Sequence, residues 1–304
     1  MTAAREIKLL QSMDHPNIVK LRQICASSAA SVYLVFEYLD YDLSGLLQHP
    51  SGNLFSMAQV KCIIYQLLQA LLYLHSHGVV HRDLKGSNVL LSRTGQVKLA
   101  AFGLAKIFHH PDLRAEEHVC TRMMTNRVIT IWYRPPEILL GSTKYGSEVD
   151  MWGVGCILLE LLYGKAVFTG QDEISQLETI TRRLGSIPRH TESMKNLPWF
   201  VPVLDCLGED SSSPSSPSIQ GDFLSEEFGD KLGAEGLDLV RRLLSLDPTR
   251  RINAKDALQH HWFNISPHQC ASHELLPNLE GDWHEYECKQ RNRRKRDQAP
   301  SLEA

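Results

Sequence analysis

The stretch His81–Asn88, which reads HRDLKGSN, decides the fold and the chemistry that we predict for this chain. Phosphoryl transfer to an alcohol needs an acceptor for the hydroxyl proton, and Asp83 can supply one. It also needs positive charge beside the transferring phosphate, which Lys85 can provide, and hard oxygen ligands for Mg²⁺, of which Asn88 offers one. These three residue types in one short loop indicate a phosphotransferase site.

The segments on either side of this loop have clear local patterns. Upstream, Ser56 with Gln59 three positions later has the spacing of a capping box, and the apolar residues that follow recur at helical period. Gly78 suits the exit of that helix. Downstream, the strands Val89–Leu91 and Val97–Leu99 flank a turn and predict a small hairpin. The loop is therefore expected between a long helix and a hairpin.

The rest of the chain predicts an α+β protein. Near the start, 2–13 has the apolar face of a helix, and the segments Ile18–Ile24 and Val32–Phe36 resemble two strands. The segments predicted as later helices are Asp150–Tyr163, Glu173–Leu184, Glu235–Leu246 and Ala254–Trp262. The first of these is apolar on nearly all sides, which is typical of a helix buried in a core. A small strand-containing piece thus precedes a mostly helical body.

Composition limits the classes of function. The chain has 304 residues, of which 43% are hydrophobic and 22% charged, as in ordinary globular proteins. A formal net charge of -3 argues against a direct nucleic-acid binder. The seven cysteines form no CxxC pair and are read as reduced thiols. No secretory signal and no membrane span are expected, because charged and polar residues interrupt the apolar stretches.

With these motifs in view, the chain resembles protein kinases, specifically the cyclin-dependent branch. The spacing from Asp83 to Asn88 matches the protein-kinase catalytic loop. The other stretches that carry the resemblance are TAAREI (Thr2–Ile7), VYLVFEYLDYDL (Val32–Leu43), TNRVITIWYRPPEILLG (Thr125–Gly141), GSEVDMWGVGCILLELL (Gly146–Leu162) and DPTRRINAKDAL (Asp247–Leu258). The resemblance covers about residues 2–263. TNRVIT and LDYDLSGLL are most similar to transcriptional kinases that phosphorylate the RNA polymerase II C-terminal domain.

The resemblance implies a bilobal protein-kinase fold with an incomplete small β lobe and a mostly α-helical large lobe. Residues 1–38 would be a remnant of the small lobe, with a cyclin-contacting helix, two strands and the start of the hinge. Residues 39–265 would form the large lobe. Residues 266–304 are expected to be an irregular tail with a basic cluster, Arg291–Arg296, for which a nuclear import signal and a merely solvated end remain equal alternatives.

The same resemblance assigns site residues. Asp83 matches the catalytic base, Lys85 the phosphate-facing lysine, and Thr130 a residue that contacts both. Asn88 matches a magnesium ligand. The residues that match the ATP pocket are the gatekeeper Phe36, the hinge residues Glu37 and Leu39, the ribose contact Asp42 and the pocket floor Leu90.

Further positions match regulation and structure. Thr125 matches the activating phosphorylation site, and the basic residues expected to bind its phosphate are Arg5, Arg82 and Lys106. Glu6 matches the glutamate that pairs with an ATP-site lysine. The structural positions are a Glu137–Arg251 ion pair and Asp150, a buried brace of the catalytic loop.

Two departures from the family pattern affect the nucleotide site. The segment KLAAFGLAK places Ala101 where the family carries a metal-binding aspartate, and a methyl group offers Mg²⁺ no oxygen. No GxGxxG occurs in this sequence and no lysine precedes Glu6, so the glycine-rich loop over the phosphates and the Lys–Glu pair are absent from it. We therefore interpret the sequence as N-terminally truncated relative to the family pattern.

Three hypotheses follow. The first is a cyclin-dependent Ser/Thr kinase that uses ATP and Mg²⁺ on Ser/Thr-Pro sites, with a cyclin partner and a nuclear, otherwise cytoplasmic, location. The second is a pseudokinase that binds cyclin or substrate without catalysis, and the third is an inactive fragment. Ala101 favours the second and third, whereas Asp83, Lys85, Asn88 and Thr125 favour an active relative.

Overall fold

The computed structural model describes residues 10–26, 32–50, 55–107, 129–207, 222–276 and 281–298. Arg5, Glu6 and Thr125, the Ser/Pro-rich segment 211–218 and most of the helix predicted over 2–13 lie outside the described residues. The strands are β1 (Leu21–Ala26), β2 (Val32–Phe36), β3 (Tyr41–Asp42), β4 (Val79–Val80), β5 (Val89–Leu91), β6 (Val97–Leu99) and β7 (Lys106–Ile107). The α-helices are α2 (Leu43–Leu47), α3 (Met57–Ser76), α4 (Pro136–Leu139), α5 (Glu148–Tyr163), α6 (Glu173–Leu184), α7 (Phe200–Cys206), α8 (Phe223–Leu243), α9 (Ala254–Leu258) and α10 (Glu285–Gln298).

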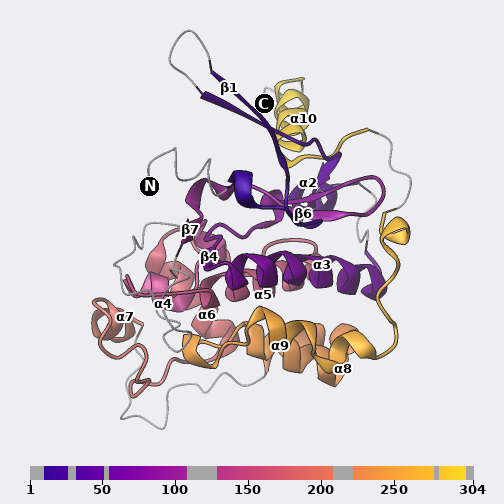
Figure 1. Ribbon diagram of the computed structural model, residues 1–304. Helices are drawn as coiled ribbons and strands as arrows, with labels where there is room; N and C mark the ends of the chain where they lie inside the picture. The colour runs from indigo at the N-terminus through magenta and orange to yellow at the C-terminus, as the bar shows by residue number, and fades with distance from the viewer. Residues whose placement is uncertain are drawn as a thin grey trace, which may run out of the picture.

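The helical body is built around α3 and α5. The Ser56 side chain accepts a hydrogen bond from the Gln59 amide, and Gln59 returns one to the Ser56 amide, so the predicted capping box is present. Helix α5 is buried along nearly its whole length, as its apolar sequence predicts. Helices α8 and α9 pack beneath this pair (Figure 1). This core supports the catalytic loop from below.

Short strands hold the catalytic loop at both ends. β4 pairs antiparallel with β7 just before the loop, and β5 pairs with β6 just after it. β5 also pairs with β3, so the three-stranded sheet has the order β3-β5-β6. The hairpin of β5 and β6 forms over the residues that the sequence predicted. Because both ends of the loop are fixed by strand pairing, its side chains have defined directions.

The sheet of β1 and β2 has little cover. Among the described strands, these two pair only with each other, and they extend away from the helical body (Figure 1). Val32, Tyr33 and Val35 are 57%, 60% and 43% exposed, respectively, although all three are apolar or aromatic. The apolar faces of β1 and β2 are therefore largely uncovered in the described part of the chain. A two-stranded sheet of this kind is marginally stable without further packing.

The C-terminal segment corrects one expectation, because residues 285–298 form helix α10 instead of an irregular tail. Its sequence is rich in Glu, Lys, Gln and Arg, which are good helix formers. Lys289 pairs with Glu285 at helical spacing. The buried Cys288 side chain faces the backbone of Gly45 in α2.

Helix α3 is long and apolar enough, by length and composition, to cross a membrane. However, 61% of its most apolar window is buried inside the protein. Its apolar residues are occupied by contacts with α5, α9 and β6. Packing in the core of the described protein therefore accounts for the apolar composition of α3.

Candidate active site

A buried aspartate braces the catalytic loop from below. The Asp150 carboxylate, at the start of α5, accepts hydrogen bonds from the backbone amides of His81 and Arg82, both at 2.9 Å. The His75 ring, on α3, lies 2.9 Å from the same carboxylate. Burial raises the pKa of Asp150, but the hydrogen bond and charge of His75 outweigh it, so the pKa lies below its usual value. The brace fixes Arg82 in a left-handed backbone conformation, with φ of 68°.

The loop brings together three of the predicted catalytic side chains. Lys85 Nζ lies 3.0 Å from Asp83 Oδ2 and 3.1 Å from Thr130 Oγ1. The Thr130 hydroxyl donates to Asp83 Oδ1 at 3.0 Å, although 47 residues separate the two in sequence. Asn88 Nδ2 donates to Asp83 Oδ2 at 2.9 Å. Asp83 is thus held in one orientation by three neighbours.

These contacts also set the charge of Asp83. Burial raises its pKa, but the hydrogen bond and charge of Lys85, with smaller contributions from Thr130 and Asn88, bring it below the usual value. Asp83 is therefore ionised at neutral pH. A carboxylate with a low pKa orients a hydroxyl group well but holds a proton weakly. The arrangement suits an acceptor that positions the attacking oxygen and takes its proton late.

The metal side of the site does not fit Mg²⁺. Asn88 is 7% exposed and donates its amide hydrogens to Asp83, which leaves its carbonyl oxygen as a possible ligand. Ala101 supplies no second oxygen. No group of three or more His, Cys, Asp or Glu side chains that could hold a metal occurs in the described part of the chain. One amide oxygen does not provide the carboxylate that Mg²⁺ normally takes.

Ala101 nevertheless keeps an unusual backbone conformation. Its φ and ψ are 62° and 65°, in the left-handed region that alanine rarely adopts. The adjacent Phe102 ring packs edge-on against His81, with centroids 5.1 Å apart. Position 101 therefore keeps a strained backbone conformation although its side chain has no polar atom.

The residues predicted to surround adenine are only partly enclosed. Phe36 is 37% exposed, whereas Leu39 is buried and Leu90 is half-buried in β5. Glu37 Oε1 accepts hydrogen bonds from Lys98 Nζ at 2.6 Å and from the Lys20 amide at 2.8 Å. Phe36, Glu37, Leu39 and Leu90 lie along the junction between the β1–β2 sheet and the body. Their role in binding adenine stays a prediction.

Asp42, the predicted ribose contact, accepts hydrogen bonds from backbone amides at the starts of two helices. Its Oδ1 atom accepts the Gly45 amide at 2.7 Å and caps α2. Its Oδ2 atom accepts the Glu285 amide at 2.8 Å, at the first residue of α10. The preceding residue, Tyr41, forms a parallel bridge with Trp283. Both carboxylate oxygens of this 5% exposed residue therefore bind backbone amides.

Comparison with known proteins agrees with this geometry. Residues 1–263 match the protein kinase domain family. The chain belongs to the protein kinase family. It is 41% identical over 292 residues to the CTD kinase subunit alpha of Schizosaccharomyces pombe, covering 96% of this chain and 46% of that protein. It is 39% identical over 307 residues to cyclin-dependent kinase C-1 of Arabidopsis thaliana, covering 96% of this chain and 56% of that protein.

Solved structures place the kinase in the cyclin-dependent branch. The yeast RNA Pol II CTD kinase CTDK-1 complex has a chain that matches with a TM-score of 0.76 and 40% identity, covering 89% of this chain and 83% of that one. The CAK complex of Chaetomium thermophilum bound to ATP-gamma-S matches with a TM-score of 0.75 and 34% identity, covering 90% and 80%. The kinase spans about half the length of the curated relatives it matches.

The regulatory residues of the kinase are only partly described. Arg82 Nε donates to the Leu104 carbonyl at 2.6 Å, and its Nη1 donates to Tyr145 Oη at 3.2 Å. Lys106 in β7 pairs with Val80 in β4, two residues before Arg82. The predicted phosphate site at Thr125 and its third cation, Arg5, lie outside the described residues. The phosphate clamp therefore stays a prediction.

The predicted structural ion pair of the kinase is formed in the core. Arg251 Nη1 lies 2.7 Å from Glu137 Oε1, and Arg251 Nη2 lies 3.0 Å from Glu137 Oε2. The two side chains are 0% and 3% exposed. Arg251 also donates to the Ser245 and Glu148 carbonyls, so most of its donors are used. This bidentate pair anchors α4, and with it the preceding loop 129–135 (the substrate-side loop), to the segment between α8 and α9.

Sequence reasoning missed one buried carboxyl group near the site. Glu160, within the apolar run of α5, is 6% exposed and accepts a hydrogen bond from Tyr133 Oη at 2.7 Å. A single ionisable residue in the run CILLELL is a signal that could have marked it, because a buried carboxyl needs a partner. The apolar pattern predicts a buried helix here, but it does not identify the partner of this glutamate.

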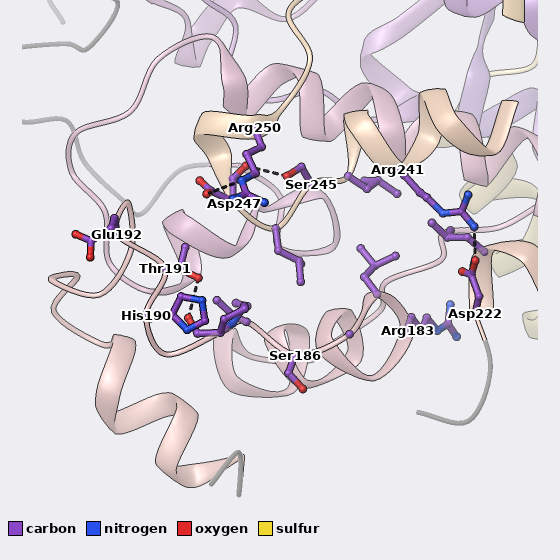
Figure 2. A pocket seen from close by; sticks show the side chains of 17 residues that line it. Arg183, Ser186, His190, Thr191, Glu192, Asp222, Arg241, Ser245, Asp247 and Arg250 are labelled. Atoms are coloured by element: carbon purple, nitrogen blue, oxygen red, sulfur yellow. Dashed lines mark hydrogen bonds and ion pairs between the residues drawn. The ribbon is translucent and has the colours of Figure 1, made fainter. Parts of the chain in front are cut away.

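A separate cavity lies beside α6. It has a volume of about 900 Å³ and is lined by the end of α6, the loop after it, both ends of α8 and the segment that follows α8 as far as Arg250 (Figure 2). Its charged residues are largely matched, since Arg241 pairs with Asp222 and Arg250 with Asp247. None of the assigned catalytic residues lines this cavity.

Proposed function

We propose that this protein is a cyclin-dependent Ser/Thr protein kinase module that binds Ser/Thr-Pro segments and whose phosphoryl transfer is limited by Ala101. The proposal rests on the mutual contacts of Asp83, Lys85 and Thr130, together with the alanine at position 101 in place of a metal-binding carboxylate. The substrates would include the RNA polymerase II C-terminal domain, because two similar proteins are named as kinases of that domain. We also propose a cyclin partner, which the similarity to cyclin-dependent kinase C-1 supports, and a nuclear location, which the similarity to an RNA Pol II CTD kinase supports.

The acceptor side would act through its own residues. A substrate hydroxyl would donate to the Asp83 carboxylate, which is already oriented by Lys85 and Thr130. As the oxygen forms its bond to the γ-phosphorus of ATP, the bond from that phosphorus to the β–γ bridging oxygen would break and ADP would leave. The hydroxyl proton would pass to Asp83, and the ammonium group of Lys85 would offset the charge on the transferring phosphate. Magnesium bound to ATP neutralises phosphate charge in protein kinases generally. Because its ligand set is incomplete here, we derive no step through the metal.

The test is a two-by-two set of proteins assayed with a cyclin. The chain is used alone or fused downstream of the glycine-rich strands of a similar kinase, and position 101 is Ala or Asp. ATP affinity and phosphorylation of a Ser-Pro peptide are measured for each. We expect Ala101→Asp alone to give almost no turnover, because nothing in this sequence supplies the glycine-rich loop that positions the phosphates.

Only the fused Ala101→Asp protein should turn over rapidly, so the two changes should be strongly non-additive. Adding Asp83→Asn to that protein should abolish the gain, which separates transfer at this site from a contaminating kinase. If the unfused Ala101→Asp chain turns over as fast as the fused one, the proposed requirement for the glycine-rich strands is wrong. If the fused Ala101→Asp protein does not phosphorylate the peptide, the kinase assignment of the acceptor side is wrong.

Ala101 favours a second candidate, a binding module without catalysis. In that case the unaltered chain should bind a cyclin and a Ser-Pro peptide with affinities that do not depend on ATP or Mg²⁺. Calorimetric titration with each partner measures this. Peptide binding that is lost in Thr130→Ala but kept in Ala101→Asp would support the module, because the two residues belong to different sides of the site.

A further inference from the structure

Two arginines from different helices line one end of the cavity beside α6. Helices α6 and α8 both carry an Arg-Arg pair in their last turn. Arg183 of the first pair and Arg241 of the second line the cavity, whereas Arg182 and Arg242 do not. Figure 2 shows both lining arginines at the same end as Asp222, which caps the start of α8. Two guanidinium groups thus approach one end of the cavity.

These two guanidinium groups keep N–H donors for a further anion. Arg241 forms an ion pair with Asp222, but the two side chains are 45% and 48% exposed, so the pair contributes little stability. Arg183 stacks on the Phe223 ring, with its guanidinium carbon 4.8 Å from the ring centre, and donates to the Val167 carbonyl. No carboxylate in the described part of the chain forms an ion pair with Arg183. A stacked guanidinium group still presents its edge to a phosphate.

Apolar side chains form the floor of the same cavity. Ile187, Leu224 and Leu244 line it and are buried. Cations beside an apolar floor suit a ligand that has an anionic group next to a compact apolar group. A phosphoserine followed by proline has this composition, because the phosphate carries about two negative charges and the proline ring is rigid and apolar.

The chain carries Ser-Pro sequences next to this cavity. The segment 208–221, which lies outside the described residues, reads GEDSSSPSSPSIQG and contains Ser213–Pro214 and Ser216–Pro217. It ends directly before Asp222, which lines the cavity. Ser216 precedes Asp222 by six residues, a stretch that spans at most about 20 Å when extended. Ser216 is therefore within reach of the arginines beside Asp222.

Charge makes the match depend on phosphorylation. The segment 208–221 has two acidic residues, Glu209 and Asp210, and no Lys or Arg. A serine hydroxyl is neutral and cannot replace the Asp222 carboxylate at Arg241. A phosphate has about two negative charges and three acceptor oxygens, so it forms stronger charge-assisted hydrogen bonds with arginine than a single carboxylate does. Only the phosphorylated segment is therefore expected to bind.

We propose that the cavity beside α6 binds phosphoserine-proline, and that its occupant is the chain's own segment 208–221 phosphorylated on Ser216. Arg183 and Arg241 bind the phosphate, and Pro217 packs on the apolar floor. That a Ser-Pro kinase adds the phosphate rests on the proposed function. In that step the Ser216 oxygen bonds to the γ-phosphorus of ATP, ADP leaves, and the hydroxyl proton passes to the base of the kinase.

The experiment uses the full chain with phosphoserine encoded genetically at position 216, so no kinase reaction is needed. The ³¹P NMR signal is followed from about pH 4.5 to pH 8, around the second pKa of phosphoserine, which is about 6. The reference is a free peptide of residues 208–221 with the same phosphate. We expect the midpoint in the chain to be lower by about one pH unit, because the arginines favour the dianion. Equal midpoints in chain and peptide overturn the proposal.

The two Arg-Arg pairs provide matched control variants. Arg241→Gln and Arg183→Gln should each move the midpoint back towards that of the free peptide. Arg182→Gln and Arg242→Gln remove cations that do not line the cavity and should leave the midpoint unchanged. Equal shifts in all four variants would show a general effect of charge and overturn the site. Arg241→Gln decides the test if Arg183→Gln does not fold, because the Arg241 side chain is 45% exposed.

Two further measurements test the assigned occupant. Phosphoserine encoded at position 213 should shift the midpoint less, because Ser213 lies nine residues from Asp222, and an equal or larger shift overturns the assignment to Ser216. A separate phosphoprotein is the alternative occupant. If the free phosphopeptide binds Ser216→Ala chain through Arg241 while phosphorylated Ser216 keeps the free midpoint, the occupant is not the chain's own segment. No phosphoryl transfer is measured, so failure of the kinase assay is a separate result.

Discussion

The acceptor side and the nucleotide side of the candidate site use their carboxylates in different ways. On the acceptor side, Asp83 and Asp150 bind side chains and amides within the catalytic loop and its supports. On the nucleotide side, Asp42 binds the first turns of α2 and α10, and position 101 has no carboxylate. The carboxylates of the acceptor side therefore order the catalytic loop itself, whereas Asp42 on the nucleotide side stabilises the starts of two helices.

The difference extends to the supports behind each side. The catalytic loop lies on α3 and α5, whose apolar residues are almost fully buried. The nucleotide side lies where the exposed β1–β2 sheet joins the body, and its Asp42 contacts the start of α10, which carries mostly charged residues. Changes to the acceptor side should therefore affect stability more strongly than changes to the nucleotide side. The following predictions test this difference.

The largest effect is expected for Asp150→Ala. The change leaves two buried loop amides and His75 without their acceptor, which should reduce the free energy of unfolding by about 3–5 kcal/mol. Asp238→Ala is the matched control, since Asp238 also lies 2.9 Å from a histidine, His260, but its side chain is 46% exposed. That variant should lose less than about 1 kcal/mol. Equal losses in urea unfolding would refute burial as the cause.

Asp42→Ala should have the next largest effect. It removes a carboxylate that binds the first turn of α2 and the start of α10, and each cap contributes about 0.5–2 kcal/mol. Hydrogen exchange should quicken at both helix starts. Asp172→Ala, which removes the cap of α6 alone, is the control and should affect that helix only. If α10 keeps its protection in Asp42→Ala, the second cap is unimportant.

A smaller effect concerns acid. The pKa of Asp83 is lower in the folded chain than its usual 3.8, so its contribution to stability is present above that value and is lost as pH falls through the folded pKa. Asp83→Asn should cost about 1–2 kcal/mol at neutral pH and should flatten the acid limb of the stability curve. Unfolding measured between about pH 5 and pH 2 would show this. A parallel curve in the variant would contradict it.

Glu160 should contribute with the opposite sign. Its folded pKa of about 7 lies above the usual 4.5, so it binds more protons in the folded state, and stability should fall as pH rises between these values. This contribution should vanish in Glu160→Gln and persist in Asp83→Asn. In a plot of the free energy of unfolding against pH, Asp83→Asn should therefore change the acidic range and Glu160→Gln the range between about pH 4.5 and pH 7.

The smallest effect is expected for Ala101→Gly. Glycine adopts the left-handed conformation of position 101 without the steric penalty of a Cβ atom, but it is more flexible in the unfolded chain. The net change in the free energy of unfolding should be below about 1 kcal/mol and favourable. Ala105→Gly, in the extended conformation at the end of the same turn, should be unfavourable. If both variants are destabilised equally, no strain is stored at Ala101.

The sequence by itself determined the features that depend on neighbours along the chain. The capping box of α3, the β5–β6 hairpin and the bounds of α6 follow from local spacing and turn residues, and the structure has them at the predicted positions. The family resemblance also named Asp83, Lys85 and Thr130, which the fold brings within 3.1 Å of one another. Short-range periodicity and motif order were sufficient for these predictions.

Only the tertiary structure decided which partners the buried polar groups have. Asp42 meets Glu285 across 243 residues, and Glu160 meets Tyr133 across 27. Helix α10 was not predicted because part of its support comes from Gly45 in α2, across 243 residues. Local spacing cannot fix such contacts, because they depend on how α5, the substrate-side loop and the C-terminal segment pack together. Burial then sets the pKa and hydrogen-bonding role of each group, which the same residue type in water would not have.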